Sequence, residues 1–298
     1  MDPRPDTLTQ LDDAVIRILA PNPSPMTYWG TNTYVLGTGN ARVLIDPGPD
    51  DASHRQAILN ALPHGTRLSH ILVTHAHVDH SAGARALAQE TGAPVFAFGD
   101  AQAGRAAHMD ALARNGLLAG GEGLDHSFVP DEILPHGTVL DTPAGAIKAL
   151  HTPGHMGNHL CFGFRDTVFS GDLIMGWSSS LISPPDGDAA AFRDSCALLM
   201  THAPAQLLPG HGAPVKAPRE RIQFLLLHRG AREAQILRAL ADTPMDLTTL
   251  TRAVYTDLPH SHLPIAARNT LAHLIDLEQQ NRISATPKLS ETATFSVR

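Results

Sequence analysis

The sequence predicts an α/β protein in which two mixed β-sheets are enclosed by helices and followed by a small α+β domain. Three observations lead to this prediction. Short β-like segments open the chain, strands and helices then alternate, and short strands return before residue 216. From residue 217 onward, three helical patterns and a final pair of strands replace that rhythm. This order of meander, alternation and meander is typical of two packed sheets with outer helices.

The size and charge of the chain suit this architecture. Of its 298 residues, 43% are hydrophobic and 17% are charged, so it can bury one large core and one small one. The formal net charge of −7 argues against a protein that coats nucleic acid. We therefore expect two domains, residues 1–216 and 217–298.

The cysteines and the N-terminal segment indicate a cytoplasmic protein. The two cysteines, Cys161 and Cys196, are too few for a disulfide framework. Residues 1–10 are polar and lack the apolar core of a signal peptide. Because no apolar stretch is long enough to cross a bilayer, we also expect no membrane association.

The elements of the first domain follow the hydrophobic pattern. Apolar, β-branched runs bounded by turn residues predict strands, and longer periodic stretches predict helices. Residues 99–135 are rich in Gly and Ala and give no clear prediction. The expected strands span residues 15–19, 34–36, 42–46, 71–73, 95–98, 139–140, 147–150, 161–164, 167–169 and 206–208, and the expected helices span 51–62, 81–90 and 188–200.

The second domain has the parts of a small winged helix. Helical periodicity covers residues 219–240, 247–255 and 265–280, and alternation within 283–297 predicts a hairpin. The last of these helices has Arg268 as its one basic residue and also carries Asp276 and Glu278, so it is poorly suited to nucleic acid. A protein contact, such as a homodimer interface, is therefore an alternative role for this domain.

One short segment contains most of the expected chemistry. The run Thr74-His75-Ala76-His77-Val78-Asp79-His80 directly follows a predicted buried strand. In an extended segment, His75 and His77 point the same way and can share one metal ion. The turn into the next helix then directs Asp79 and His80 toward a second ion. Imidazoles and carboxylates are suitable ligands for zinc, iron or manganese.

Three later segments repeat the order of apolar strand, tight Gly or Pro turn and potential ligand. They are His151-Thr152-Pro153-Gly154-His155, Ser170-Gly171-Asp172 and Pro209-Gly210-His211. One histidine at a strand end is usually a loop or capping residue. Four potential ligands within six residues, followed by three matching segments, instead indicate a metal centre built on loops that a rigid sheet positions.

The ordered motifs HxHxDH, PGH, GD and GH resemble those of the metallo-β-lactamase-fold superfamily, over roughly residues 12–215. The resemblance implies an αββα sandwich with two divalent metal ions at one edge. It also implies a ligand set: His75, His77 and His155 for the first ion, Asp79, His80 and His211 for the second, and Asp172 between them. Asp46 matches an aspartate that supports the site from behind, although a plain turn residue explains it equally well.

Such a centre predicts hydrolysis. Two ions can hold a bridging hydroxide at neutral pH and can polarise a carbonyl or phosphoryl group. Zinc is the expected metal, with iron or manganese as alternatives, and we assign catalytic roles to Asp79, Asp172 and His155. His151 and His159 are candidates for orienting a ligand or protonating a leaving group, and a purely structural role is the alternative for each.

The residues at two positions narrow the classes of reaction that we expect. Zinc β-lactamases proper have a cysteine where this chain has Asp172, and flavodiiron oxygen reductases have a carboxylate where it has His77. The aspartate resembles the thioesterase and phosphodiesterase branches. We therefore expect neither β-lactam hydrolysis nor oxygen reduction.

The substrate prediction comes from a closer resemblance. The segments Gly30-Thr31-Asn32-Thr33-Tyr34 and Gly176-Trp177-Ser178-Ser179-Ser180, together with the winged-helix-like tail, resemble the β-lactamase-like protein 2 group. That group includes endoribonucleases acting on single-stranded RNA, so a phosphodiesterase on such RNA is expected. We expect Trp177, Ser178 and Ser179 to line the substrate pocket. The main alternative is a glyoxalase-II-like thioesterase acting on a small molecule. A mononuclear iron dioxygenase of the persulfide type and a non-catalytic binding protein are less favoured.

Overall fold

The computed structural model describes residues 3–117 and 123–298, and within these ranges the strands form three sheets. Residues 1–2 and 118–122, which belong to the N-terminal segment and to the segment 99–135 considered above, lie outside the described residues. The first sheet has the strand order β1 to β7, namely β1 (Leu8–Asp12), β2 (Val15–Leu19), β3 (Asn32–Leu36), β4 (Ala41–Ile45), β5 (Arg67–Leu72), β6 (Val95–Ala97) and β7 (Glu132–Ile133).

The first sheet changes from antiparallel to parallel at β4. Strands β1 to β4 pair as antiparallel neighbours, whereas β4 to β7 run parallel. Parallel neighbours need a long crossover, and helices supply it here: α1 (Ala52–Asn60), α2 (Val78–Ser81) and α3 (Ala84–Thr91). Helix α1 begins where the Asp51 carboxylate accepts a hydrogen bond from the His54 amide, which is a standard N-terminal cap.

The second sheet has the order β12-β11-β10-β9-β8. Its strands are β8 (Val139–Thr142), β9 (Gly145–His151), β10 (Leu160–Phe164), β11 (Thr167–Gly171) and β12 (Gln206–Pro209). Strands β8 to β11 are antiparallel, and β12 returns parallel to β11 through helix α5 (Ala189–His202). Strands β10 and β11 are buried along their whole length, because both faces of this sheet are covered.

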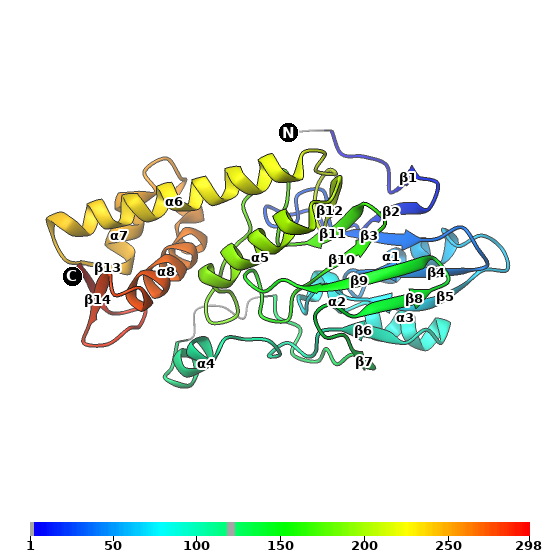
Figure 1. Ribbon diagram of the computed structural model, residues 1–298, viewed down its shortest axis with the longest axis horizontal. Coiled ribbons are helices and arrows are strands. Elements are labelled where there is room, and N and C mark those ends of the chain that lie inside the picture. Colours follow the sequence, from blue (N-terminus) through cyan, green and yellow to red (C-terminus); the bar gives the residue numbers. More distant parts are fainter. Residues whose placement is uncertain (1–2, 118–122) are drawn as a thin grey trace.

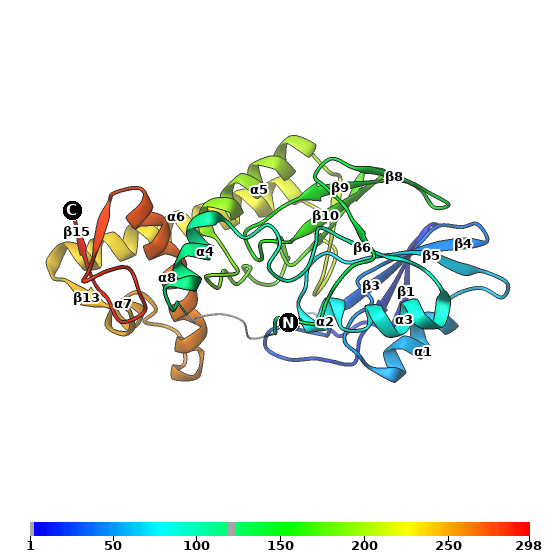
Figure 2. The same ribbon diagram turned by 90° about the horizontal axis from the view of Figure 1, so that it is seen from below.

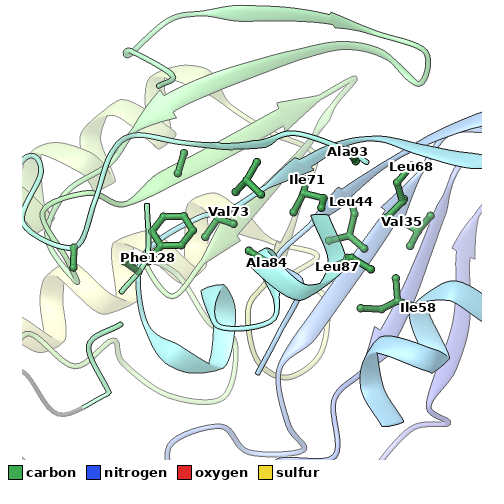
Figure 3. Close-up of a cluster of buried hydrophobic side chains, with 14 of the residues drawn as sticks. Val35, Leu44, Ile58, Leu68, Ile71, Val73, Ala84, Leu87, Ala93 and Phe128 are labelled. Atoms are coloured by element: carbon green, nitrogen blue, oxygen red, sulfur yellow. The ribbon is translucent and has the colours of Figure 1, made fainter. Parts of the chain in front are cut away.

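The two sheets and their helices form four layers. Figure 2 shows α1 and α3 on the outside of the first sheet, and α5 on the outside of the second. One apolar cluster, drawn in Figure 3, joins Leu44 and Ile71 of the first sheet to Ile58 of α1 and Leu87 of α3. A second cluster lies between the sheets, and a third lies between the second sheet and α5. The fold is therefore the expected αββα sandwich.

The C-terminal part has its own apolar cluster. Helices α7 and α8 pack against the end of α6 and against the short third sheet, which has the order β13-β15-β14. In Figure 1 this part lies beyond one end of the sandwich. Its elements are α6 (Pro218–Asp242), β13 (Met245–Asp246), α7 (Leu247–Val254), η1 (His260–His262), α8 (Leu263–Gln279), β14 (Ile283–Thr286) and β15 (Thr294–Val297). The domain boundary at residues 216 and 217 stays a prediction.

The structure departs from the sequence prediction in three places. Strand β1 forms in a segment that we considered only for its polarity. The helix expected at 81–90 is divided into α2 and α3 around Gly83. The segment 99–135 contains helix α4 (Ala107–Arg114), whose Met109 joins the C-terminal cluster. In the described part of the chain, no helix combines the length and apolar character that a membrane span requires.

Candidate metal centre

The expected ligands all follow the ends of strands of the two sheets. Strand β5 ends at Leu72, just before the HxHxDH run, and β9, β11 and β12 end at His151, Gly171 and Pro209. These strands are hydrogen-bonded within the sheets and packed against the core, so the loops that follow them begin from fixed positions. These strand ends lie on the side of the sandwich that faces the C-terminal helices (Figures 1 and 2).

The first group of side chains consists of His75, His77 and His155. The Nε2 atom of His75 lies 2.9 Å from Nδ1 of His77, and Nε2 of His155 lies 3.1 Å from the same atom. The outer nitrogens of two of these rings have partners of their own. Nδ1 of His155 donates to the Leu181 carbonyl at 2.8 Å, and Nδ1 of His75 lies 2.9 Å from the Thr74 hydroxyl. The inner Nε2 atoms of those two rings are therefore left as lone-pair donors.

The second group consists of Asp79, His80 and His211. The Nε2 atoms of the two histidines are 3.3 Å apart, and each lies 3.3 to 3.4 Å from Oδ2 of Asp79. Their Nδ1 atoms again point outward, to Oδ2 of Asp46 at 2.8 Å and to the Gly30 carbonyl at 3.2 Å. The carboxylate is held as well, because the Thr31 hydroxyl donates to the same Oδ2 of Asp79 at 3.1 Å.

Asp172 lies between the two groups. Its Oδ2 is 3.8 Å from Nε2 of His155 and 3.4 Å from Nε2 of His211, while its Oδ1 is 3.5 Å from Nε2 of His80. Oδ1 is buried and has no hydrogen-bond partner among the described residues. A buried carboxylate oxygen is normally paired. An orphaned oxygen among converging imidazole nitrogens therefore fits a pair of divalent ions with Asp172 between them.

Burial and neighbouring charge set the protonation of the two groups. Burial lowers the pKa of His77 to about 3 and also lowers the pKa of His75 and His155. Burial opposes a charge on His80 as well, but the carboxylates of Asp79 and Asp172 outweigh it and raise the pKa of His80 to about 9. At pH 7 the first group is therefore neutral and ready to bind a cation. In the second group, a cation would replace the proton on His80.

Asp46 contacts His80 of the second group directly and reaches His75 of the first group through Thr74. Its carboxylate accepts hydrogen bonds from the Thr74 amide at 2.7 Å, from the Thr74 hydroxyl at 2.8 Å and from His80. Because that hydroxyl gives its proton to Asp46, it accepts from Nδ1 of His75. The backbone of Asp46 has a φ of 53°, a strained conformation for a residue with a side chain. This geometry favours a supporting role over a plain turn.

His159 and His151 occupy different positions. Nε2 of His159 accepts from the Asp172 amide at 3.2 Å, so this ring supports the backbone of Asp172. A Cβ atom on Gly171, which has a φ of 47°, would lie 2.6 Å from that nitrogen, so the site needs a glycine there. His151 stacks on Phe98, with ring centroids 3.7 Å apart, and its Nε2 donates to the Gly157 carbonyl.

A cleft of about 490 Å³ opens beside the centre. His155 and Asp172 lie on its wall, and so do Trp177, Ser178 and Ser179, the three residues expected to line a pocket. The Trp177 ring stacks on Tyr28 with centroids 4.8 Å apart. The opposite wall comes from the C-terminal part and includes His228, Arg232, Val254, Tyr255 and Ile265.

Sequence reasoning did not find several contributors. Thr31, Thr74 and the carbonyls of Gly30 and Leu181 contact the outer atoms of the expected ligands. Thr74 was detectable because it directly precedes the HxHxDH run. The carbonyls left no signal, since any residue type provides one. The wall from the C-terminal helices was also missed, because nothing in the local pattern places it near the centre.

Comparisons with known proteins agree with this geometry. Residues 26–211 match the family model of the metallo-beta-lactamase superfamily, and residues 243–290 match that of the beta-lactamase associated winged helix domain. A beta-lactamase-like protein 2 homolog from Drosophila melanogaster is 30% identical over 95% of this chain and 94% of its own. An atrochrysone carboxyl ACP thioesterase from Passalora fulva is 31% identical over 78% of this chain and 63% of its own.

Solved structures show the same fold. A metallo-beta-lactamase family protein from Thermus thermophilus matches with a TM-score of 0.77 and 22% identity, over 97% of this chain and all of its own. A beta-lactamase domain protein from Burkholderia ambifaria matches with a TM-score of 0.78 and 21% identity, over 98% and 93% of the two chains. The chain thus belongs to the metallo-beta-lactamase superfamily, as a metal-dependent hydrolase with an associated winged-helix domain.

Proposed function

We propose that the protein is a dinuclear hydrolase in which His75, His77 and His155 bind one divalent ion and Asp79, His80 and His211 bind the other. Asp172 would lie between the two ions. The convergence of both groups on the Asp172 carboxylate, whose Oδ1 has no hydrogen-bond partner among the described residues, carries this proposal. We propose zinc as the native metal, with iron or manganese as alternatives. When bound, two such ions activate water near neutral pH and polarise the scissile bond.

Neighbouring residues hold the proposed ligands in place. Asp79 is fixed by Thr31, His155 by the Leu181 carbonyl, and Asp172 by its backbone contact with His159. Burial raises the pKa of Cys161 and of Cys196 to about 12, so both thiols stay protonated and neither is suited to act as a nucleophile. The proposed reaction therefore uses water as its nucleophile.

The cleft favours a thioester with an apolar acyl group. Met26, Met175, Leu181, Val254 and Ile265 contribute apolar side chains to its lining. Two of the basic side chains on its wall, Arg232 and His228, are poorly suited to bind phosphate. Arg232 donates to the Val254 carbonyl and lies 3.8 Å above the Tyr255 ring, while burial lowers the pKa of His228. An RNA site would instead present a basic track for phosphates.

Single-stranded RNA remains the second candidate because of two features. The cleft reaches the winged-helix domain, and Trp177 offers an aromatic face for a base. The cytoplasmic location and the homodimer also stay proposals.

An assay panel with metal analysis tests the proposal. The purified protein is loaded with zinc, iron or manganese and assayed with S-lactoylglutathione, with longer acyl thioesters, with bis(p-nitrophenyl) phosphate, with single-stranded RNA and with a β-lactam. We expect about two ions per chain and turnover of thioesters that improves with apolar acyl groups. Cleavage of RNA without thioester turnover would replace the first candidate by the second. A content of one iron per chain would contradict the proposal of a dinuclear hydrolase.

A further inference from the structure

The loop at residues 172–182 has little regular structure, yet it carries key contacts of the centre. It runs from Asp172 through Trp177 to Ile182 without forming a helix or strand. The Leu181 carbonyl accepts from Nδ1 of His155 at 2.8 Å, and the Ser180 hydroxyl donates to the Asp172 carbonyl at 2.5 Å. Irregular backbone has no ladder of hydrogen bonds to pair its polar groups, and side chains from other elements bind several of them here.

Helix α6 supplies two of those side chains, and both are arginines. Arg221 donates from Nε to the Met175 carbonyl and from Nη2 to the Ser178 carbonyl, each at 2.7 Å. Arg229, two turns further along the helix, donates from Nη2 to the Ser180 carbonyl at 2.5 Å. A planar guanidinium can span two carbonyls in a fixed geometry, which a lysine ammonium cannot do.

Arg229 is the more unusual of the two because it is buried. Only 8% of the residue is exposed, and its guanidinium lies 4.4 Å above the Phe192 ring of α5. A buried cation is costly unless its contacts compensate for lost water. The Ser180 carbonyl and the Phe192 ring face are contacts of that kind.

Helix α8 completes the set through Asn269. Its Oδ1 accepts from the Ile182 amide at 3.1 Å. The C-terminal helices thus hold the backbone of residues 175, 178, 180 and 182, on both sides of the Leu181 carbonyl that contacts His155.

We infer that the C-terminal domain is a positioning part of the metal centre, acting through the 172–182 loop. Arg221, Arg229 and Asn269 are the positioning residues. By fixing the loop they fix the acceptor for Nδ1 of His155, and this acceptor determines which nitrogen of the ring faces the ions. The inference rests on the proposed metal centre, but it does not depend on which ester is the substrate.

The test uses the full chain with Arg221→Ala, Arg221→Lys and Asn269→Leu, and with Arg238→Ala as the matched control. Arg238 is an exposed arginine on the same helix. The first measurement is hydrogen exchange of residues 173–182 in the metal-free protein. The second is titration with cobalt(II), followed by its visible absorption spectrum, which reports ligand geometry.

We expect Arg221→Ala and Asn269→Leu to speed exchange in the loop, to change the cobalt spectrum and to weaken cobalt binding about 10- to 100-fold. Arg221→Lys should show smaller changes than Arg221→Ala, because one hydrogen-bond donor remains. Arg238→Ala should match the wild type in every measurement. The inference is overturned if Arg221→Ala and Asn269→Leu leave exchange and spectrum unchanged, or if Arg238→Ala alters them equally. A wild type that binds no cobalt would instead refute the metal centre, whereas the exchange data would still report on the loop.

Discussion

The Asp172 carboxylate lies between two groups of histidines, and its Oδ1 has no hydrogen-bond partner among the described residues. We predict that Asp172→Ala abolishes turnover and second-ion binding while the fold survives. The loss should exceed the roughly 10- to 100-fold that removing an outer partner of a ligand costs. Turnover, metal content and circular dichroism check this, with Asp166→Ala in an exposed turn as the control. An active variant that keeps both ions would remove the bridging assignment.

We expect Trp177 to affect the binding of substrate rather than the chemical step. Its ring lines the cleft and stacks on Tyr28, so its removal should weaken substrate binding more than chemistry. We predict that Trp177→Ala raises KM about 2- to 10-fold, the range of one aromatic contact, with a smaller change in kcat. Trp177→Phe, which keeps a ring, is the matched variant. An unchanged KM in the alanine variant would exclude Trp177 from the substrate site.

The residue scale also shows what the sequence could and could not reveal. The seven expected ligands were recognisable because each follows a strand end within a compact motif, and the structure brings all seven together. Most of their outer partners were not, since contacts such as that between Nδ1 of His211 and the Gly30 carbonyl join residues far apart in the chain. Only the folded chain brings such a carbonyl and a distant histidine together.

Among the secondary-structure elements, strand β12 ends in close contact with the side chains of the metal centre. A Cβ atom on Gly210 would lie 2.5 Å from Oδ1 of Asp172 and 2.6 Å from Cε1 of His80. We predict that Gly210→Ala displaces both side chains and lowers metal affinity at least tenfold. Metal titration checks this.

Gly230 provides the contrasting control for Gly210. It lies on the exposed side of α6, and a Cβ atom added there would have nothing within 4 Å among the described residues. Gly230→Ala should therefore raise the free energy of unfolding by about 0.4–1 kcal/mol and leave metal binding unchanged. If both alanine variants bound metal like the wild type, tight packing at β12 would not matter to the centre.

The elements themselves were predictable where the pattern was strong. A buried strand such as β10 is a run without polar residues, and α6 has a long helical period, so both types of element were expected. Strand β1 alternates between exposed and half-buried residues at the sheet edge. Because it buries little surface, its sequence lacks the apolar run that predicts a strand. Helix α4 is short, and its apolar side packs on the distant C-terminal cluster, so its stability comes from contacts that a local pattern cannot show.

The stability of the protein depends on pH in part through two buried histidines outside the proposed ligand set, His54 and His273. Burial lowers the pKa of His54 to about 4 and that of His273 to about 3. In the unfolded chain both titrate near 6.5. Below that pH the unfolded state therefore binds more protons than the folded state, and stability falls as pH drops from about 6.5 toward 4.

We predict that urea unfolding of the metal-free protein at pH 5 shows about 2 kcal/mol less stability per histidine than at pH 7, at about 1.4 kcal/mol per pH unit below 6.5. His273→Gln should remove about 2 kcal/mol of this pH dependence, and His64→Gln, on an exposed turn, is the matched control. Equal pH dependence in the wild type and His273→Gln would show that His273 does not stay neutral in the fold.

Helix α6 has a consequence for how the protein unfolds. Ile222 and Leu225 near its start belong to the cluster beneath α5, and Ile236 and Leu240 near its end belong to the C-terminal cluster. One continuous helix therefore contributes side chains to both cores, so unfolding of either core removes packing contacts from the other. Calorimetry should show a single cooperative endotherm for the whole chain, and a protein truncated after residue 216 should lose heat resistance in the sandwich that remains.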